Sequence, residues 1–192
     1  MAMLEYNEIR QRKHIIFEGE PYEVLDSHVF RKQQRKPVNQ TKLKNMISGR
    51  VVEHAFHQSD KAVEAEIETK QVKYLYSNPK NNEIWFCYEN KPGERFSLAE
   101  EIIGPALKFL KENSIVSAMI FDDRIIGIKL PIKVELRVTE APPTIKGNTA
   151  QGGNKQVTLE TGANVNAPLF INAGDIITVN TETGEYTDRV SK

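Results

Sequence analysis

Residues 72–88 have the sequence VKYLYSNPKNNEIWFCY, in which two short runs rich in aromatic and aliphatic residues flank a polar segment. Runs of this kind predict β-strands, and the Asn and Pro residues of 77–82 favour a tight turn. We therefore expect a β-hairpin with strands over 72–76 and 84–88. Cys87 lies in the second run, and as the only cysteine it cannot form an intramolecular disulfide, so we expect it to fill the core.

The same pattern of short strand-like runs recurs along the chain. HIIF at 14–17 and PYEVL at 21–25 flank a Glu-Gly-Glu turn, and the runs 176–179 and 182–186 indicate a closing hairpin. Strands this short are hard to assemble into one sheet, whereas small antiparallel barrels of about 60 residues accommodate them. The chain of 192 residues has room for three such barrels, and we predict a mainly β protein.

One stretch has helical spacing, with Pro105 near its start and Asn113 just past its end. Its apolar residues recur at intervals of three and four: Ile102, Ile103, Ala106, Leu107 and Leu110. We expect one short helix there, in the second barrel. Junctions between barrels are predicted near 65–68, where acidic residues precede a new apolar run, and at Pro131, which interrupts two strand-like segments. The domains are thus expected at 1–66, 67–130 and 131–192.

The composition is that of a globular protein. Apolar residues make up 39% and charged residues 27%, unlike the low hydrophobicity and high net charge of disordered chains. Charged residues within the first 14 positions exclude a secretory h-region there, and no apolar run approaches the roughly 20 residues that span a bilayer. We expect a cytoplasmic protein without membrane contact. The formal net charge is zero, so a nucleic-acid partner has to be argued from where the charges lie.

The strongest charge asymmetry lies between residues 31 and 50, which contain no acidic residue. The segment holds seven cations: Arg31, Lys32, Arg35, Lys36, Lys42, Lys44 and Arg50. Residues 31–37 are wholly polar and follow a strand-like run that ends at Phe30, so we expect an exposed hairpin loop. Cations there suit an RNA phosphate backbone, but they equally suit a solvated loop or a device against edge-to-edge strand pairing. Composition does not decide between these alternatives.

A second candidate loop spans 146–155 and combines three glycines and two lysines with small polar residues. Such a composition lets backbone N–H groups approach a phosphate or a base. Its spacing matches neither a Walker A loop nor a dinucleotide fingerprint. By itself the segment is typical of an ordinary loop.

The sequence gives little support to an enzyme. The chain has four histidines: His14, His28, His54 and His57. The last two form a His-x-x-His pair without the glutamate and helix of a metalloprotease site, and we expect all four at the surface or at barrel edges. The acidic pairs Glu100-Glu101 and Asp122-Asp123 are explained by a helix start and by a turn. We therefore expect no catalytic residue, no cofactor and no metal.

Short motifs cover most of the C-terminal third: Lys146-Gly147-Asn148-Thr149-Ala150, Gly152-Gly153, Thr158-Leu159-Glu160-Thr161-Gly162, Pro168-Leu169-Phe170-Ile171-Asn172, Gly174-Asp175 and Thr183-Gly184-Glu185-Tyr186. Together they resemble the third domain of the elongation factor P family. The resemblance extends to Gly19-Glu20-Pro21-Tyr22, Lys42-Leu43 and Tyr74-Leu75-Tyr76, and so covers nearly the whole chain. The family pattern expects alanine in place of Val157 and valine in place of Ala167, and both replacements stay small and apolar.

This resemblance implies a KOW/SH3-like N-terminal barrel followed by two OB-fold barrels in an L-shaped, tRNA-like arrangement. It implies a monomeric factor that binds ribosomal RNA and ribosomal proteins between the P and E sites, beside the peptidyl-tRNA, when consecutive prolines stall synthesis. The loop tip that would face the tRNA and the peptidyl transferase centre comprises Lys32, Gln33, Gln34, Arg35 and Lys36. RNA backbone contacts are expected from Arg31, Lys42 and Lys44. The ribosome-facing loop of the third domain would comprise Lys146, Gly147, Asn148, Thr149, Gly152, Gly153 and Lys155.

The loop tip departs from the family pattern. Many members carry a modified lysine or arginine at the apex, whereas an ungapped alignment of the flanking motifs puts Gln34 there. This argues against a tip-modifying enzyme as a partner, and our hypothesis is that Gln34 works unmodified while Lys32 and Arg35 supply charge. An elongation factor P-like paralogue that serves other stall sequences is the alternative, and the loop does not discriminate between the two. Initiation factor five A is disfavoured because it ends after two domains, whereas residues 131–192 supply a third.

Overall fold

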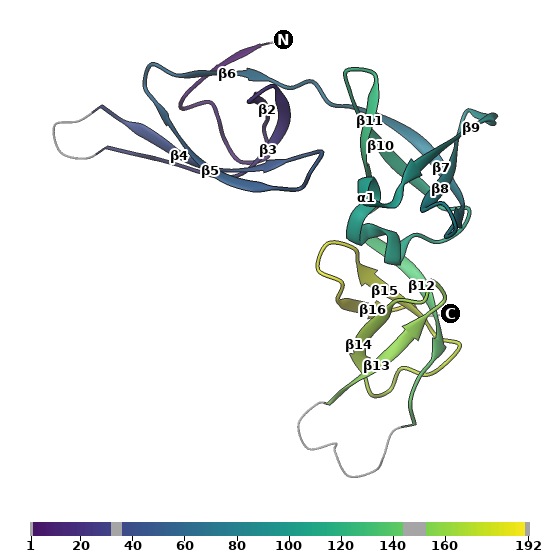
Figure 1. Ribbon diagram of the computed structural model, residues 1–192. Helices are drawn as coiled ribbons and strands as arrows, with labels where there is room; N and C mark the ends of the chain where they lie inside the picture. The colour runs from purple at the N-terminus through teal and green to yellow at the C-terminus, as the bar shows by residue number, and fades with distance from the viewer. Residues whose placement is uncertain (1, 32–35, 144–152, 191–192) are drawn as a thin grey trace. The chain divides into compact units, whose positions relative to one another are not determined.

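The computed structural model describes residues 2–31, 36–143 and 153–190 (Figure 1). As predicted, the chain is mainly β, and its strands form three antiparallel sheets. Contacts between residues divide the chain into two compact units, one of residues 1–70 and 118–127 and the other of residues 71–117 and 128–192.

The first sheet lies in the first unit and has the strand order β1-β6-β2-β3-β4-β5. Its strands are β1 (Met3–Glu5), β2 (His14–Phe17), β3 (Glu20–Phe30), β4 (Val38–Asn45), β5 (Val51–His57) and β6 (Lys61–Glu64). The predicted first hairpin is confirmed, because Phe17 pairs with Glu20 across Glu18 and Gly19. Both turn residues have positive φ, 52° and 84°, which matches the twist of a two-residue hairpin. Buried apolar side chains form the core of this sheet: Leu4, Ile9, Ile15, Tyr22, Val24, Leu43, Phe56 and Ala62.

The second sheet has the strand order β11-β10-β7-β8-β9. Its strands are β7 (Glu68–Asn78), β8 (Glu83–Tyr88), β9 (Lys91–Ala99), β10 (Ile115–Phe121) and β11 (Arg124–Lys129). The hairpin predicted over 72–88 is confirmed, since Val72 pairs with Tyr88 and Asn78 pairs with Glu83. Cys87 is 3% exposed, which confirms that its thiol fills the core.

The predicted short helix is confirmed in position but changes type partway along. It begins as α1 (Glu100–Ile103) and continues as a 3₁₀ helix, η1 (Gly104–Phe109). Gly104 has φ 61°, a conformation open to glycine, and it precedes Pro105, which disfavours α geometry in the residue before it. In the part of the chain that the structure describes, no helix is long and apolar enough to cross a membrane.

The third sheet has the strand order β14-β13-β12-β15-β16 and lies in the second unit. Its strands are β12 (Lys133–Glu140), β13 (Asn154–Leu159), β14 (Asn164–Pro168), β15 (Ile176–Asn180) and β16 (Tyr186–Arg189). The closing hairpin is confirmed, although its second arm begins at Tyr186 and not at Glu182, because the segment before it turns through Gly184 at φ 75°. Val157 and Ala167, the two departures from the family pattern, are both buried.

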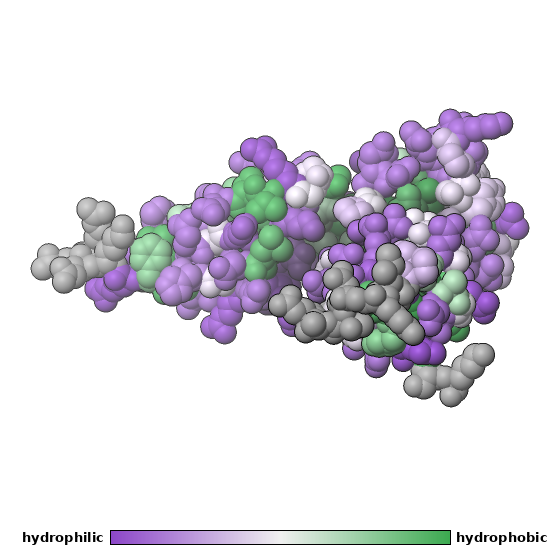
Figure 2. Space-filling view, turned by 90° about the horizontal axis from the view of Figure 1, so that it is seen from below, coloured by the Kyte–Doolittle hydropathy of each residue, from purple (hydrophilic) through white to green (hydrophobic). Residues whose placement is uncertain are grey.

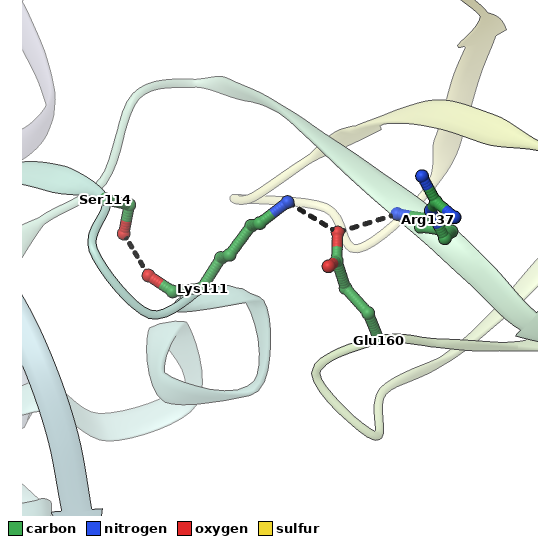
Figure 3. A network of polar contacts seen from close by, with 4 residues as sticks. All are labelled: Lys111, Ser114, Arg137 and Glu160. Atoms are coloured by element: carbon green, nitrogen blue, oxygen red, sulfur yellow. Dashed lines mark hydrogen bonds and ion pairs between the residues drawn. The ribbon is translucent and has the colours of Figure 1, made fainter.

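A polar cluster around Glu160, here called the Glu160 junction, joins the third sheet to the segment that follows η1 (Figure 3). Glu160 Oε1 accepts hydrogen bonds from the Lys111 ammonium and from the Arg137 backbone N–H, each at 2.9 Å. Glu160 N–H donates to the Arg137 carbonyl in return, and the Thr161 hydroxyl donates to the Lys108 carbonyl at 2.7 Å. The carboxylate of Glu160 thus holds the segment after η1 to β12 of the third sheet.

Burial and hydrogen-bond donors have opposite effects on the pKa of Glu160. Partial burial alone raises the pKa, but the Arg137 N–H and the Lys111 ammonium outweigh it and lower the pKa below the ordinary 4.5. The junction therefore stabilises the ionised carboxylate.

Candidate nucleic-acid interface

The basic segment lies on the hairpin formed by β3 and β4 in the first unit. The two strands pair from Tyr22–Asn45 to Phe30–Val38, with a register shift between Val24 and Asp26. Leu25 is the extra residue of a β-bulge at this shift. From Asp26 onward, each residue of β3 points to the same face of the sheet as its partner on β4, and successive pairs alternate between the inner and the outer face.

The inner face of β4 is fixed by buried polar side chains. The Asn39 amide donates to the carbonyls of Tyr6 at 2.6 Å and of Ile9 at 2.8 Å, and Asn39 is fully buried. The Thr41 hydroxyl donates to the His54 carbonyl at 2.8 Å. Buried carbonyls that lose such donors are costly, so these bonds fix the strand close to its exposed end. These hydrogen bonds anchor β4, and with it the hairpin, to the rest of the first unit.

The outer face of the hairpin is charge-balanced toward its base. In the strand register Lys42 lies opposite Asp26 on β3 and opposite Glu53 on β5, and Lys44 lies opposite Glu23 on β3. Directly opposite side chains on one face have Cβ atoms about 4.5–5.5 Å apart, so Lys42 lies between two carboxylates. The cations of this segment that the structure describes are therefore not a continuous cationic surface, because carboxylates lie opposite Lys42 and Lys44.

Toward the end of the hairpin the outer face changes character. The last two rows of paired residues contain no carboxylate: Phe30, Val38 and His57 in one, and His28, Gln40 and Ala55 in the other. Arg31 and Lys36 lie just beyond these rows and are exposed. Figure 2 shows hydrophobic side chains among hydrophilic ones near this end of the first unit. The predicted tip residues Lys32, Gln33, Gln34 and Arg35 lie outside the described residues.

The second predicted loop is described only at its end. Gly153 and Lys155 lie within the structure, and the Lys155 ammonium donates to the Pro142 carbonyl at 3.1 Å. Lys146, Gly147, Asn148, Thr149 and Gly152 lie outside the described residues. Lys155 therefore links the two chain segments that lead into and out of the loop.

His54 lies on β5, the strand at one edge of the first sheet, in keeping with the predicted edge position. It is half-buried there, and its ring centroid lies 4.7 Å from that of Phe17 and 4.5 Å from that of Phe56. Its ring shares a face with Val52 and Phe56, because residues two apart in a strand point to the same side. His28 and His57 are exposed, as predicted.

The acidic pairs have the structural roles expected of them. Glu100 and Glu101 open α1, and Asp122 and Asp123 form the turn between β10 and β11 with φ 47° and 59°. Across the described ranges, no group of three or more His, Cys, Asp or Glu residues could hold a metal ion.

Small antiparallel sheets with a supported, cationic hairpin are typical of nucleic-acid-binding barrel proteins. Comparison with family models gives the same class in finer detail. Residues 5–62 match the elongation factor P KOW-like domain, residues 67–128 match the elongation factor P OB domain, and residues 134–189 match the C-terminal domain of elongation factor P. These matches bear out the expected KOW-like barrel followed by two OB-type barrels.

Curated relatives match over the full length. Elongation factor P of Carboxydothermus hydrogenoformans is 36% identical over 188 residues, which cover 98% of this chain and all of the relative. That of Thermodesulfovibrio yellowstonii is 37% identical over 99% of this chain and all of the relative, and that of Alkaliphilus oremlandii is 40% identical over 93% of this chain and 96% of the relative. The chain belongs to the elongation factor P family. It is therefore a translation factor that works on the ribosome and not an enzyme.

A solved structure shares part of the fold. Eukaryotic translation initiation factor 5A from Methanococcus jannaschii superposes with a TM-score of 0.51 at 14% identity, covering 67% of this chain and 90% of that one. At this identity the likeness concerns the fold alone. It leaves about a third of this chain uncovered, in keeping with a third module in the elongation factor P family.

Proposed function

We propose that this protein binds between the P and E sites of the ribosome, beside the peptidyl-tRNA, and speeds the peptide bonds that form slowly at consecutive prolines. Full-length similarity to elongation factor P supports this reading. The observation that carries it within the molecule is the β3–β4 hairpin, whose cations Arg31 and Lys36 lie beyond the last carboxylate-bearing row of its outer face. A supported arm with cations at its end suits the phosphates of a tRNA acceptor arm.

The proposed mechanism is positional. The ring of proline fixes φ and makes its nitrogen secondary and hindered, so a proline-bearing donor and acceptor reach a reactive geometry rarely. An arm that restrains the acceptor end lowers the entropic cost of reaching that geometry without any general base or nucleophile. The anchoring of β4 through Asn39 gives the arm the rigidity that this role needs.

We assign roles to the predicted residues on this basis. The loop tip, which faces the tRNA end and the peptidyl transferase centre, consists of Lys32, Gln33, Gln34, Arg35 and Lys36. Backbone phosphates are contacted by Arg31, Lys42 and Lys44, with Lys42 contributing least because Asp26 and Glu53 flank it. The third-domain loop faces the ribosome through Lys146, Gly147, Asn148, Thr149, Gly152, Gly153 and Lys155.

The proposal includes three domains, at 1–66, 67–130 and 131–192, in a cytoplasmic monomer whose Gln34 acts unmodified. The matched ranges 5–62, 67–128 and 134–189 support these boundaries. Intact-mass measurement of the native protein tests the last point, and an adduct on residues 31–37 would overturn it.

Reconstituted translation of a triproline message, with and without the protein, tests the function. The protein is made without partner enzymes, so its need for modification is measured at the same time. We expect faster triproline synthesis with the unmodified protein and little effect on a message without prolines. Ribosome profiling of a deletion strain separates the paralogue reading, because pauses at other sequences, with none at consecutive prolines, would favour a paralogue.

A further inference from the structure

Two aromatic side chains form a stacked pair on the outer face of the second sheet. Tyr76 on β7 pairs with Trp85 on β8, and their rings are nearly parallel, with an interplanar angle of 19° and centroids 6.1 Å apart. Ile84 and Phe86, the neighbours of Trp85 along β8, are buried, so Trp85 points to the opposite, outer face. We call Tyr76 and Trp85 the ring pair.

Core packing does not account for the exposure of the ring pair. The inner face of this sheet has an aromatic cluster of its own, in which the ring centroids of Tyr74 and Phe96 lie 5.8 Å and 5.7 Å from that of Phe86. Tyr74 is 6% exposed, whereas Tyr76 is 44% exposed. A cross-strand pair supports a sheet on either face, so the stacking alone does not explain why these rings meet the solvent.

A β-bulge turns Tyr76 outward. The register between β7 and β8 shifts between Tyr74 and Tyr76, and Leu75 is the extra residue. Without the bulge Tyr76 would point to the inner face with Tyr74, because residues two apart in a strand share a face. Bulges of this kind re-aim side chains at functional sites. The local backbone thus places the ring of Tyr76 beside that of Trp85 and in the solvent.

The charges on the two sides of the ring pair have opposite signs. Lys73 on β7 and Arg95 on β9 lie opposite the buried Cys87, which is two positions from Trp85 along β8. Both cations therefore lie next to the ring pair on the same face. Glu83 lies two positions from Trp85 in the other direction, in the row on the other side of the rings. The ring pair has cations on one side and a carboxylate on the other.

This combination favours an unpaired segment of RNA as the ligand. Proteins that bind single strands stack bases on aromatic rings and contact the phosphates with cations, and OB folds use the face of their second and third strands for this purpose. In the second sheet these strands are β8 and β9, which carry Trp85 and Arg95 (Figure 1). Bases within a duplex are covered by neighbouring base pairs, and an apolar peptide would leave both cations unused.

We propose that the ring pair stacks on an unpaired base of ribosomal RNA whose adjoining phosphates contact Lys73 and Arg95. Members of the family work on the ribosome, which supplies such RNA, and the unpaired end of the tRNA is assigned above to the hairpin of the first unit. This site belongs to the second unit and gives the factor a contact that does not depend on the hairpin. Glu83 repels phosphate and so sets the side of the rings on which the RNA backbone runs.

The fluorescence of Trp85 tests the proposal directly. Trp85 is the only tryptophan of the chain, so its emission reports on this site alone. The full-length protein is titrated with a short single-stranded RNA, and a duplex of the same length is the control ligand. We expect saturable quenching by the single strand and little quenching by the duplex. Tyr76→Ala should weaken single-strand binding about tenfold, the loss of stacking on one base, whereas Tyr76→Phe keeps the ring and should bind as the wild type does.

Three further variants separate this site from misfolding and from the hairpin. Lys73→Ala should lower the slope of log affinity against log salt by about 0.7, the value for one phosphate contact of a single strand. Phe170→Leu changes an aromatic ring that is 57% exposed in the segment after β14, and it should leave the quenching unchanged. Replacement of residues 32–36 by alanine should also leave it unchanged, because Trp85 does not report on the hairpin.

Cross-linking on the ribosome identifies the RNA. Tyr76→p-benzoylphenylalanine places a photoreactive group in the ring pair, and on ribosomes that carry peptidyl-tRNA it should cross-link to ribosomal RNA. Cross-links to tRNA alone or to ribosomal protein alone would overturn the proposal. So would equal quenching by single-stranded and duplex RNA, or unchanged binding by both Tyr76→Ala and Lys73→Ala. Quenching by a proline-rich peptide, with none by RNA, would assign the ring pair to a protein partner and would overturn it as well.

This proposal and the proposed function fail in different ways. If the protein speeds triproline synthesis but single-stranded RNA does not quench Trp85, the ring pair is no RNA site and the proposed function stands. If the protein fails to speed triproline synthesis but binds single-stranded RNA through Tyr76 and Lys73, the proposed function is wrong and the RNA site remains.

Discussion

The β3–β4 hairpin and the Glu160 junction both carry charged groups, but these groups are used in opposite ways. At the junction one carboxylate accepts two donors, and each partner belongs to the same molecule. In the first sheet the carboxylates of Asp26 on β3 and of Glu53 on β5 lie toward the base of the hairpin, and Arg31 and Lys36 lie beyond them toward its end. Opposite charges that meet within the molecule stabilise the fold, and we propose that the cations beyond the last carboxylate serve recognition.

The largest effect should follow from removing the tip cations. Replacing residues 32–36 by alanine removes Lys32, Arg35 and Lys36, and we expect triproline synthesis to slow at least about tenfold because phosphate contacts supply the binding. The melting temperature should stay within about 2 °C of the wild type. Lys80→Ala, an exposed cation in the turn after β7, is the control and should change neither quantity. Full stimulation by the alanine variant would refute the role of the tip.

The second-largest effect should come from removing the Asn39 side chain that anchors β4. Asn39→Ala leaves the carbonyls of Tyr6 and Ile9 without their amide donor, and this should lower the free energy of unfolding by about 2 kcal/mol. Urea denaturation measures the change. Gln40→Ala, one residue along on the exposed face, should cost under about 0.5 kcal/mol. Equal costs at the two positions would mean that β4 is not held from its inner face.

At the junction we expect a smaller change. Glu160→Ala removes the acceptor of Lys111 and of the Arg137 N–H and should lower the free energy of unfolding by about 1 kcal/mol, reduced by solvent because half of the Lys111 side chain is exposed. Glu160→Gln keeps an oxygen for the Arg137 N–H and should cost less. The control is Glu94→Gln, in the surface pair with Lys91, which should be close to neutral.

The sign of the junction effect with pH follows from its pKa. Because folding lowers the pKa of Glu160 below 4.5, the contribution is complete above the unfolded-state value and is lost as the pH falls through the lower folded-state value. The stability difference between the wild type and Glu160→Gln should therefore be constant above about pH 5 and shrink below it. Urea denaturation of both proteins across this range measures it. A difference that grows on acidification would contradict the junction.

The smallest effect is expected at Lys42. With Asp26 and Glu53 beside it, Lys42→Ala should change the affinity of the protein for an RNA minihelix by about twofold or less and leave the salt dependence of binding unchanged. Lys36→Ala should lower the slope of log affinity against log salt by about 0.7 to 0.9, the value for one phosphate contact. Titration of both variants at several salt concentrations compares them. Equal slopes would remove the distinction between the base and the end of the hairpin.

Local patterns were sufficient to predict most of the fold. The hairpins at 14–25 and 72–88 follow from strand-like runs around turn residues, and the short helix follows from its spacing and Pro105. These features depend on neighbours in the sequence, which a single chain displays directly. The end of α geometry at Gly104 could also have been predicted from the sequence, because a residue before proline avoids α geometry.

The character of the candidate site depended on pairings that no local pattern contains. The carboxylate that lies opposite Lys42 on β5 belongs to Glu53, which is eleven positions away in the sequence. A run of cations was visible in the sequence, whereas the carboxylates that divide it lie on the neighbouring strands. Register decides such contacts, and register is set by the whole sheet.

The bulge at Leu25 gives the arm a property of its own. If all residues of β3 paired regularly without the bulge, Leu25 would lie opposite Lys42, Asp26 would face Thr41 on the buried side, and His28 would follow it inward. The bulge thus decides which side chains of the hairpin meet the solvent and which meet the core. Changes that abolish the bulge while keeping every residue of β3 should therefore be far more harmful than most exchanges at the same position.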